Sequence, residues 1–244
     1  HDLANDGLLE TLEALETAGI TSAGAGRNRM EARAPAVKVV SGKGRVIVFA
    51  VGSATSGVPA AWGASEERPG VSRLDGLGNK SLDDIQQTVA QFKRRGDVVV
   101  VSIHWGGNWG HRIPAEQTRF AHRLIDDAGV DIVHGHSSHH VRAAEVYRDK
   151  LILYGCGDFI NDYEGIGGYE RLRPDLGLMY FTTHAVGSGQ LLRLEAVPMR
   201  IERLRLNRAT RQEAEWLRER LARESERFGV SVGLGDDNAL QLSW

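Results

Sequence analysis

Two short apolar runs, joined by a helical segment, dominate this sequence, and most of its histidines follow one run or the other. The first run, Val98–Ile103, is β-branched and nearly unbroken, as in a strand buried on both faces of a parallel sheet. Pro114 opens the segment between the runs, where apolar residues recur at helical spacing from Phe120 to Ala128. The second run is Val130–Val133. This order predicts a right-handed crossover that leaves the two strands parallel.

The clustered histidines lie at the carboxyl ends of these two runs. His104 directly follows the first run, and His134, His136, His139 and His140 follow the second. Parallel strands bring their carboxyl ends to one sheet edge, where open α/β sheets bind ligands, so we expect the histidines to converge. Imidazole is the commonest protein ligand of transition metals. His104, His136 and His139 are the first candidates for binding a divalent ion, with His134 and His140 in reserve.

A structural role is the alternative for every one of these histidines. A single buried histidine is more often a core residue with satisfied hydrogen bonds than a metal ligand. We interpret His111, His122 and His184 in this way, because they fall in a loop, a helix and a distant strand. The sequence leaves both interpretations open for the clustered histidines.

The composition is that of one globular domain over residues 1–244, of which 41% are hydrophobic and 25% charged. The formal net charge is −2 and the basic residues are spread along the sequence, so we expect no nucleic-acid partner. No apolar run reaches the roughly 18 residues that a membrane span needs, so we expect no transmembrane segment. We recognise no signal peptide, but the sequence begins with His1 rather than Met, which leaves the compartment open.

Cys156 is the only cysteine, which excludes an internal disulfide. It follows the apolar run Leu151–Tyr154, so we expect it to be buried, and a catalytic thiol is the alternative. The sequence has no P-loop, no GxGxxG after a strand and no GxSxG elbow. These absences disfavour nucleotide-dependent transfer and serine hydrolysis.

Hydrophobic periodicity predicts several elements before the first apolar run. They are a helix at residues 7–19, strands at 37–40 and 45–51 joined by a glycine turn, and a helix that starts at a capping box of Ser81 and Asp84. A long loop at residues 52–78 contains Trp62. Trp62 either pins this loop or lines a substrate cleft, and we favour pinning.

The part of the chain after the histidines is predicted to contain strands, a helix and one glycine-rich loop. The strands are expected at 142–147, 151–154, 176–183 and 190–206, and the helix runs from Thr210 to Arg227, with a capping box at Glu213 before a final strand pair. Asp158, Asn161, Asp162 and Glu164 lie in the loop. Acidic residues there bind a metal or substrate, or they simply form turns, and Asp158 is the strongest functional candidate.

Three stretches together resemble the CapA-like, poly-gamma-glutamate capsule-synthesis family. They are Ser102–Gly110, the histidine run His134–His140, and Glu145–Tyr163, and the predicted helix at 7–20 matches that family as well. The family is part of the calcineurin-like metallophosphatase superfamily. The resemblance implies an α/β fold, a calcineurin-like sandwich of two β-sheets flanked by helices. It also implies divalent metal ions (Mn, Zn or Fe), two of them in the complete protein.

The resemblance also implies ligand positions. His104 falls on the histidine of the family's His-Trp-Gly motif, and counting back from Glu145 puts His139 on the second histidine of its Gly-x-His-Pro-His motif. Ser137 falls on the first, for which His136 is the substitute. We therefore expect His104, His136, His139 and His134 as metal ligands, and His104, His136 and Asp158 as the catalytic residues.

The family's early motifs, an Asp ligand, Asn-Glu and Asn-His, precede the region that matches, and Asp2 falls shortly after the Asn-His position. The expectation is therefore a sequence that is N-terminally incomplete and holds part of a dinuclear site. The histidine of the Asn-His motif would protonate the leaving group in the complete protein.

By this resemblance the protein is a metal-dependent phosphoesterase-like hydrolase linked to a bacterial capsule. It would act on a small-molecule or polymer substrate, with capsule-synthesis proteins as partners, in the bacterial cytoplasm or cell envelope. One alternative is a non-catalytic accessory or scaffold protein of polymer synthesis or export. Another is a metal-dependent amide hydrolase acting on a glutamyl polymer, because a fold and a metal do not fix the substrate.

Overall fold

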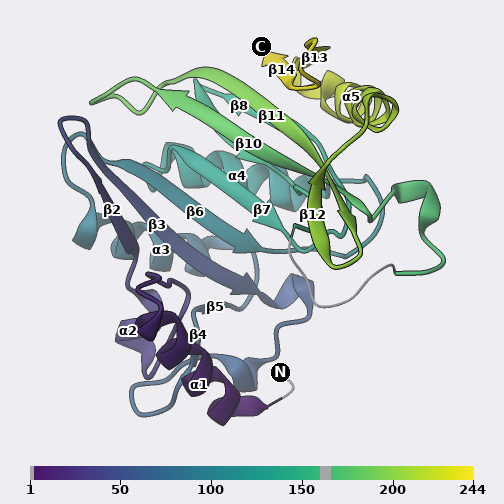
Figure 1. Ribbon diagram of the computed structural model, residues 1–244. Coiled ribbons are helices and arrows are strands. Elements are labelled where there is room, and N and C mark those ends of the chain that lie inside the picture. Colours follow the sequence, from purple (N-terminus) through teal and green to yellow (C-terminus); the bar gives the residue numbers. More distant parts are fainter. Residues whose placement is uncertain (1–2, 160–165) are drawn as a thin grey trace. The chain divides into compact units, whose positions relative to one another are not determined.

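The computed structural model describes residues 3–159 and 166–244 and shows a mixed α/β protein with several sheets (Figure 1). It contains two compact units, and their segments are as follows. The first comprises His1–Trp105 and Ala115–Val133, and the second comprises Gly106–Pro114 and His134–Trp244. The loop residues Asn161, Asp162 and Glu164, like Asp2, lie outside the described residues. A single domain over residues 1–244 stays a prediction, as does the calcineurin-like arrangement.

The sheet of the first unit is built on β3 (Gly44–Ser53). β2 (Ala36–Val40) pairs with it antiparallel through the predicted glycine turn, and β6 (Val98–His104) pairs with it in parallel. β5 (Arg73–Leu74) also runs parallel to the end of β3. In Figure 1, β2, β3 and β6 lie side by side in this order.

The predicted strand at Val98–Ile103 is confirmed, but only one of its faces is fully buried. Val99, Val101 and Ile103 have no exposed surface, whereas the alternate residues are half-buried. The burial of each such side chain contributes about 1.5–3 kcal/mol to folding. The carboxylate of Asp131, just before β7 (Ile132–His136), accepts a hydrogen bond of 2.9 Å from the Val99 backbone nitrogen.

The long helices of the first unit have the predicted apolar stripes, but two of them begin elsewhere. The long helices are α1 (Ala4–Thr17), α3 (Asn79–Phe92) and α4 (Ala115–Asp126), and the short α2 (Arg29–Arg33) was not predicted. α1 starts at Ala4, so the predicted start of this helix at residue 7 is wrong by three residues. The capping box at Ser81 and Asp84 is also wrong. Ser81 is buried inside the first turn, and Asp84 accepts a hydrogen bond from Arg33 instead.

The long loop between β3 and α3 contains short ordered elements. They are η1 (Ala54–Ser56), η2 (Ala60–Trp62) and β4 (Gly70–Val71), which pairs with β1 (Ala25–Gly26). Gly70 approaches the loop so closely that a Cβ atom there would lie 2.5 Å from the Trp62 carbonyl oxygen. A side chain at this position would therefore push the loop away.

The second unit contains a hairpin and a larger antiparallel sheet. The hairpin is β8 (Ala144–Tyr147) with β9 (Lys150–Leu153), as predicted. The sheet has the order β10 (Leu176–His184), β11 (Leu191–Glu202), β14 (Leu240–Ser243) and β13 (Ser231–Leu234), with β12 (Arg205–Arg208) also on β11. The predicted single strand at 190–206 is wrong, because Arg203 and Leu204 both take φ 54° and turn the chain into a hairpin.

One helix, α5 (Arg211–Ser225), covers part of the second unit and begins at the predicted capping box of Thr210 and Glu213. Leu217 and Leu221 are fully buried, and the Ser225 hydroxyl accepts a hydrogen bond of 3.0 Å from the Ala144 backbone nitrogen at the start of β8. Two short turns, η3 (Glu170–Leu172) and η4 (Glu226–Phe228), complete the unit. Among the described helices, none is long and apolar enough to cross a membrane.

One edge of the first unit's sheet is exposed. Four of the five residues of β2 are exposed to solvent, among them Val37 and Val39. Only β3 pairs with β2 in the part of the chain that the structure describes.

Candidate functional site

The hairpin of β8 and β9 determines which residues lie opposite each other at the candidate site. Ala144 pairs with Leu153, and the two segments continue past the strands, where Val141 and Cys156 form an isolated bridge. In this antiparallel register, a residue one position earlier in the first segment lies opposite a residue one position later in the second. The same count places His139 opposite Asp158.

His139 and Asp158 form the best-defined polar pair of the candidate site. The Nδ1 atom of His139 is 3.0 Å from both carboxylate oxygens of Asp158. Because a carboxylate accepts hydrogen bonds, Nδ1 carries a proton, and in the neutral ring Nε2 then has the lone pair. The side chains are 21% and 19% exposed, so a ligand can reach them. A carboxylate that orients an imidazole in this way is typical of metal-ligating histidines and of histidines that transfer protons.

His134 and His136 lie on the same face of β7. The strand was predicted to end at Val133, and this end is wrong, because β7 continues to His136. Val133 and Gly135 are buried on the opposite face, so the two histidines project from the other one, with ring centroids 5.6 Å apart. Burial lowers the pKa of His134, which favours the neutral imidazole that binds metals.

The loop Gly106–Gly110, which follows the first run of the sequence, is tied to the histidine segment. The Ser137 hydroxyl donates a hydrogen bond of 3.0 Å to the Gly106 carbonyl, and the His139 backbone nitrogen donates one of 3.2 Å to Asn108. Arg142 donates to the Gly107 carbonyl at 2.9 Å. Ser137 has φ 128°, a backbone conformation that residues other than glycine rarely adopt. Strained backbone of this kind gathers at functional sites.

Trp109 is a site residue that was not predicted from the sequence. Its ring stacks on Tyr169 with centroids 3.8 Å apart, and it lies 5.1 Å from the ring of His139. The Trp109 ring therefore lies against one side of the histidine, and Tyr169 packs on Trp109. The second tryptophan of the WGGNWG stretch was the available signal, since an aromatic residue in a glycine-rich loop after a strand often lines a site.

His140, which is buried, and His111, which is half-buried, form a second pair of histidine rings. Their ring centroids are 4.6 Å apart, and Nδ1 of His140 donates a hydrogen bond of 3.1 Å to the Val141 carbonyl. Burial, together with nearby arginines, lowers the pKa of each histidine to about 4. Both rings are therefore neutral at physiological pH. Neither ring nitrogen of His111 has a hydrogen-bond partner among the described residues, so His111 does not fit the expected core histidine with satisfied hydrogen bonds.

Cys156 offers no reactive thiol. The residue is half-buried, but desolvation of its sulfur raises the pKa to about 12. The thiolate is the nucleophilic form, and almost none of it is present near neutral pH. The geometry therefore gives no support to a catalytic cysteine.

His104 ends β6 in the first unit, where it is half-buried and its carbonyl accepts a hydrogen bond of 2.9 Å from the Ser56 hydroxyl. Its register is fixed by Gly52 of β3, which lies directly opposite. His136 and His139 belong to the second unit. The convergence of His104 with either of them therefore stays a prediction. Within residues 3–159 and 166–244, no three His, Cys, Asp or Glu side chains form a ready metal-binding group.

Comparison with known proteins gives one family and several relatives. Residues 1–163 match the family model described as "Bacterial capsule synthesis protein PGA_cap". A protein of Mycobacterium tuberculosis named "Probable polyglutamine synthesis accessory protein" is 47% identical over 242 residues, which is 99% of this chain and 63% of that protein. "Capsule biosynthesis protein CapA" of Bacillus anthracis is 28% identical over 82% of this chain and 45% of its own length.

A second CapA protein matches a shorter part of the chain. "PGA biosynthesis protein CapA" of Bacillus subtilis is 34% identical over 113 residues, 46% of this chain and 27% of that protein. The chain thus spans less than two thirds of the length of the curated relatives it matches.

Proposed function

The chain belongs to the bacterial capsule synthesis protein PGA_cap family, which confirms the resemblance found in its motifs, and on this basis we propose that it is a metal-dependent phosphoesterase-like hydrolase of capsule and polyglutamate synthesis. One observation carries the catalytic part of this proposal. It is the pairing of His139 with Asp158, which orients an imidazole nitrogen toward a ligand. The proposal includes the calcineurin-like sandwich as the fold and capsule-synthesis proteins as partners.

The proposed metal ligands are His104, His136 and His139, with His134 as a fourth candidate. The residues suit a divalent transition ion such as Mn, Zn or Fe, because their donors are imidazole nitrogens with a carboxylate behind one of them. A short stretch of chain supports the inclusion of His104. Gly106 follows it by two residues, and the Gly106 carbonyl accepts a hydrogen bond from Ser137, the neighbour of His136.

The residues of the chain would have the following roles in hydrolysis. A bound divalent ion supplies a Lewis acid that activates water and neutralises the anionic transition state. Asp158 holds a proton on Nδ1 of His139, so that in the neutral ring Nε2 is the nitrogen available to the ligand. The Trp109 ring lies beside His139 and would limit its rotation, and Tyr169 stacks on Trp109. Arg142 holds the loop of Trp109 through the Gly107 carbonyl.

A non-catalytic accessory protein is the second candidate function. The name of the Mycobacterium tuberculosis relative, 47% identical, describes an accessory protein of polymer synthesis. A metal-dependent amide hydrolase of the glutamyl polymer is a further alternative, since activated water can attack a carbonyl carbon as well as phosphorus. The three functions differ in the bond that the protein would hydrolyse: a phosphoester, an amide of the polymer, or none.

The test is metal content and turnover of the purified chain. Elemental analysis after dialysis would be combined with assays on a chromogenic phosphodiester, a chromogenic phosphomonoester and poly-γ-glutamate. We expect bound divalent metal and ester hydrolysis, both lost in His139→Ala and in His104→Ala. His122→Gln, on α4, is the matched control and should keep both.

Three other results would each redirect the assignment. Release of amine from poly-γ-glutamate without ester hydrolysis would establish the amide hydrolase. Metal binding without turnover of any of the three substrates would establish the accessory protein. A chain that binds no metal would rule out the hydrolase and leave the His139–Asp158 pair with a structural role.

A further inference from the structure

A basic groove lies in the first unit, at the end of β3. It is lined by five basic side chains, Arg29, Arg33, Arg68, Arg73 and Lys80, and by two acidic ones, Asp75 and Asp84. Its volume of about 460 Å³ falls in the range of ligand-binding pockets. The chain as a whole has a net charge of −2, so an excess of three positive charges in one groove is a local feature.

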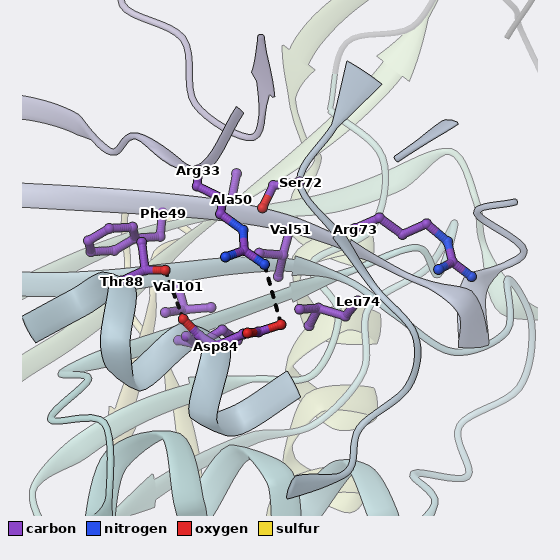
Figure 2. A pocket seen from close by; sticks show the side chains of 11 residues that line it. Arg33, Phe49, Ala50, Val51, Ser72, Arg73, Leu74, Asp84, Thr88 and Val101 are labelled. Carbon is purple, nitrogen blue, oxygen red and sulfur yellow. Dashed lines mark hydrogen bonds and ion pairs between the residues drawn. The ribbon is translucent and has the colours of Figure 1, made fainter. Parts of the chain in front are cut away.

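The two acidic residues are already used within the groove. Asp75 accepts hydrogen bonds from Arg73 and Lys80, and these bonds lower the pKa of its carboxyl group. Asp84 accepts one from Arg33 at 3.3 Å. In Figure 2, Arg33 and Asp84 point toward each other, whereas Arg73 points away from them. The pocket beneath this pair has only about 20 Å³, room for about one water molecule, and so the ligand space is the groove itself.

Two of the arginines have no carboxylate partner among the residues that the structure describes. The Arg68 guanidinium donates to the Gly63 carbonyl at 2.8 Å, which fixes its position but leaves its charge unbalanced. Arg29 is exposed at the start of α2, and its backbone nitrogen donates to the Ser65 carbonyl at 2.7 Å. A guanidinium matches a carboxylate with two parallel hydrogen bonds, so both arginines are suited to bind carboxylates of a ligand.

The groove begins close to the candidate catalytic residue of the same unit. Gly52 of β3 lies opposite Arg73 on one side and opposite His104 on the other. Two strand spacings separate Arg73 from His104, about 10 Å in all. The loop above Gly52 is held in place, because Val58 accepts a hydrogen bond of 2.9 Å from Arg73. The backbone positions of Arg73 and His104 therefore lie within the span of a few repeating units of a flexible ligand, which would pass around the Val58 side chain that packs over Gly52.

We propose that this groove binds a segment of poly-γ-glutamate through its free carboxylates and delivers the polymer to the site at His104. This inference rests on the proposed function for the identity of the polymer, but the groove itself is independent of any metal. Single-stranded nucleic acid is the competing polyanion, and its sites combine positive charge with aromatic side chains on which bases stack. None of the described residues that line the groove is aromatic.

The experiment measures binding and turnover separately. A fluorescently labelled γ-linked glutamate oligomer of about ten residues would be titrated with the chain, and the anisotropy recorded at low and moderate salt. The double variant Arg29→Gln with Arg68→Gln should bind about ten-fold more weakly, because it loses two charge-assisted contacts. The matched control is Arg205→Gln with Arg208→Gln on β12, which removes the same charge from another exposed surface.

Further variants keep the test independent of folding and of catalysis. Lys80→Gln changes a side chain that is 82% exposed, so it cannot disturb the core, and it should weaken binding about two- to four-fold. His104→Ala should bind the oligomer as well as the unchanged chain does, while it loses ester hydrolysis. If the metal and esterase assays fail but the groove variants still weaken binding, the groove stands and the catalytic function falls.

Three outcomes would overturn the inference. The unchanged chain could fail to bind the oligomer while it still hydrolyses esters. The control pair could weaken binding as much as the groove pair, which would show an effect of net charge alone. An oligothymidylate of equal charge could bind as tightly through the same arginines, which would make the groove a site for nucleic acid.

Discussion

The carboxylate of Asp158 accepts a hydrogen bond from His139 across the hairpin, with both of its oxygens 3.0 Å from Nδ1. The pair lies at the end of the segments that β8 and β9 hold together, and both partners are within two or three residues of the paired backbone. A rigid hairpin thus fixes the orientation of one imidazole.

Asp158→Asn is expected to weaken metal binding without unfolding the protein. An amide keeps the size of the side chain but loses the charge that fixes the tautomer, and changes of this kind cost about 10- to 100-fold in metal affinity or activity. Metal affinity would be measured by competition with a chromogenic chelator. The control is Asp149→Asn, in the exposed turn of the same hairpin, where φ is 61° and asparagine is well tolerated. Equal affinities for the two variants would contradict the role of Asp158.

The thiol of Cys156 is expected to be inert in the folded protein. Its pKa is raised to about 12 by burial, so near pH 8 only about one thiol in 10,000 is ionised. A chromogenic disulfide reagent should therefore react slowly with the native chain and rapidly after unfolding in guanidinium. Rapid reaction of the native chain would show that the sulfur is accessible and ionised.

Asp97→Asn is expected to lower the free energy of unfolding at neutral pH by about 1–3 kcal/mol. The Asp97 carboxylate accepts hydrogen bonds from the Arg45 guanidinium at 2.5 and 3.0 Å and is 3% exposed. The hydrogen bond from Arg45 lowers the pKa of Asp97 in the folded state. A lowered folded pKa means that this stabilisation is complete above the unfolded value of about 3.9 and is lost as the pH falls through the folded value.

Urea unfolding at about pH 7 and about pH 2 would measure this difference. The gap between the variant and the unchanged chain should be present at the higher pH and shrink at the lower one. Asp127→Asn breaks an exposed pair with Arg123, in which Asp127 is 42% exposed, and should cost about 0–0.5 kcal/mol. If the difference in unfolding free energy between Asp97→Asn and the unchanged chain were larger at low pH, the prediction would be contradicted.

The sequence predicted the elements whose signal is local. The apolar runs became β6 and β7, and the capping box of Thr210 and Glu213 starts α5, because the bonds that define a cap lie within four residues. The pairing of His139 with Asp158 could also have been predicted. It follows by counting outward from the turn between the predicted strands at 142–147 and 151–154.

Other features depend on partners far away in the sequence. Asp84 resembles a capping residue, but it pairs with Arg33, which is 51 positions earlier. The turn between β11 and β12 is made by Arg203 and Leu204, neither of which is a turn former. The five basic residues of the groove come from four separate stretches, so their gathering leaves no trace in the pattern of charge along the chain.

The exposed strand β2 has a consequence for how the protein behaves in concentrated solution. Its outer edge presents backbone groups that can extend a sheet, and Val37 and Val39 present apolar surface beside them. A strand from a second molecule could add there and begin aggregation. Lys38 lies between the two valines. Its positive charge would repel the same lysine of a second molecule, so Lys38 disfavours self-association at this edge.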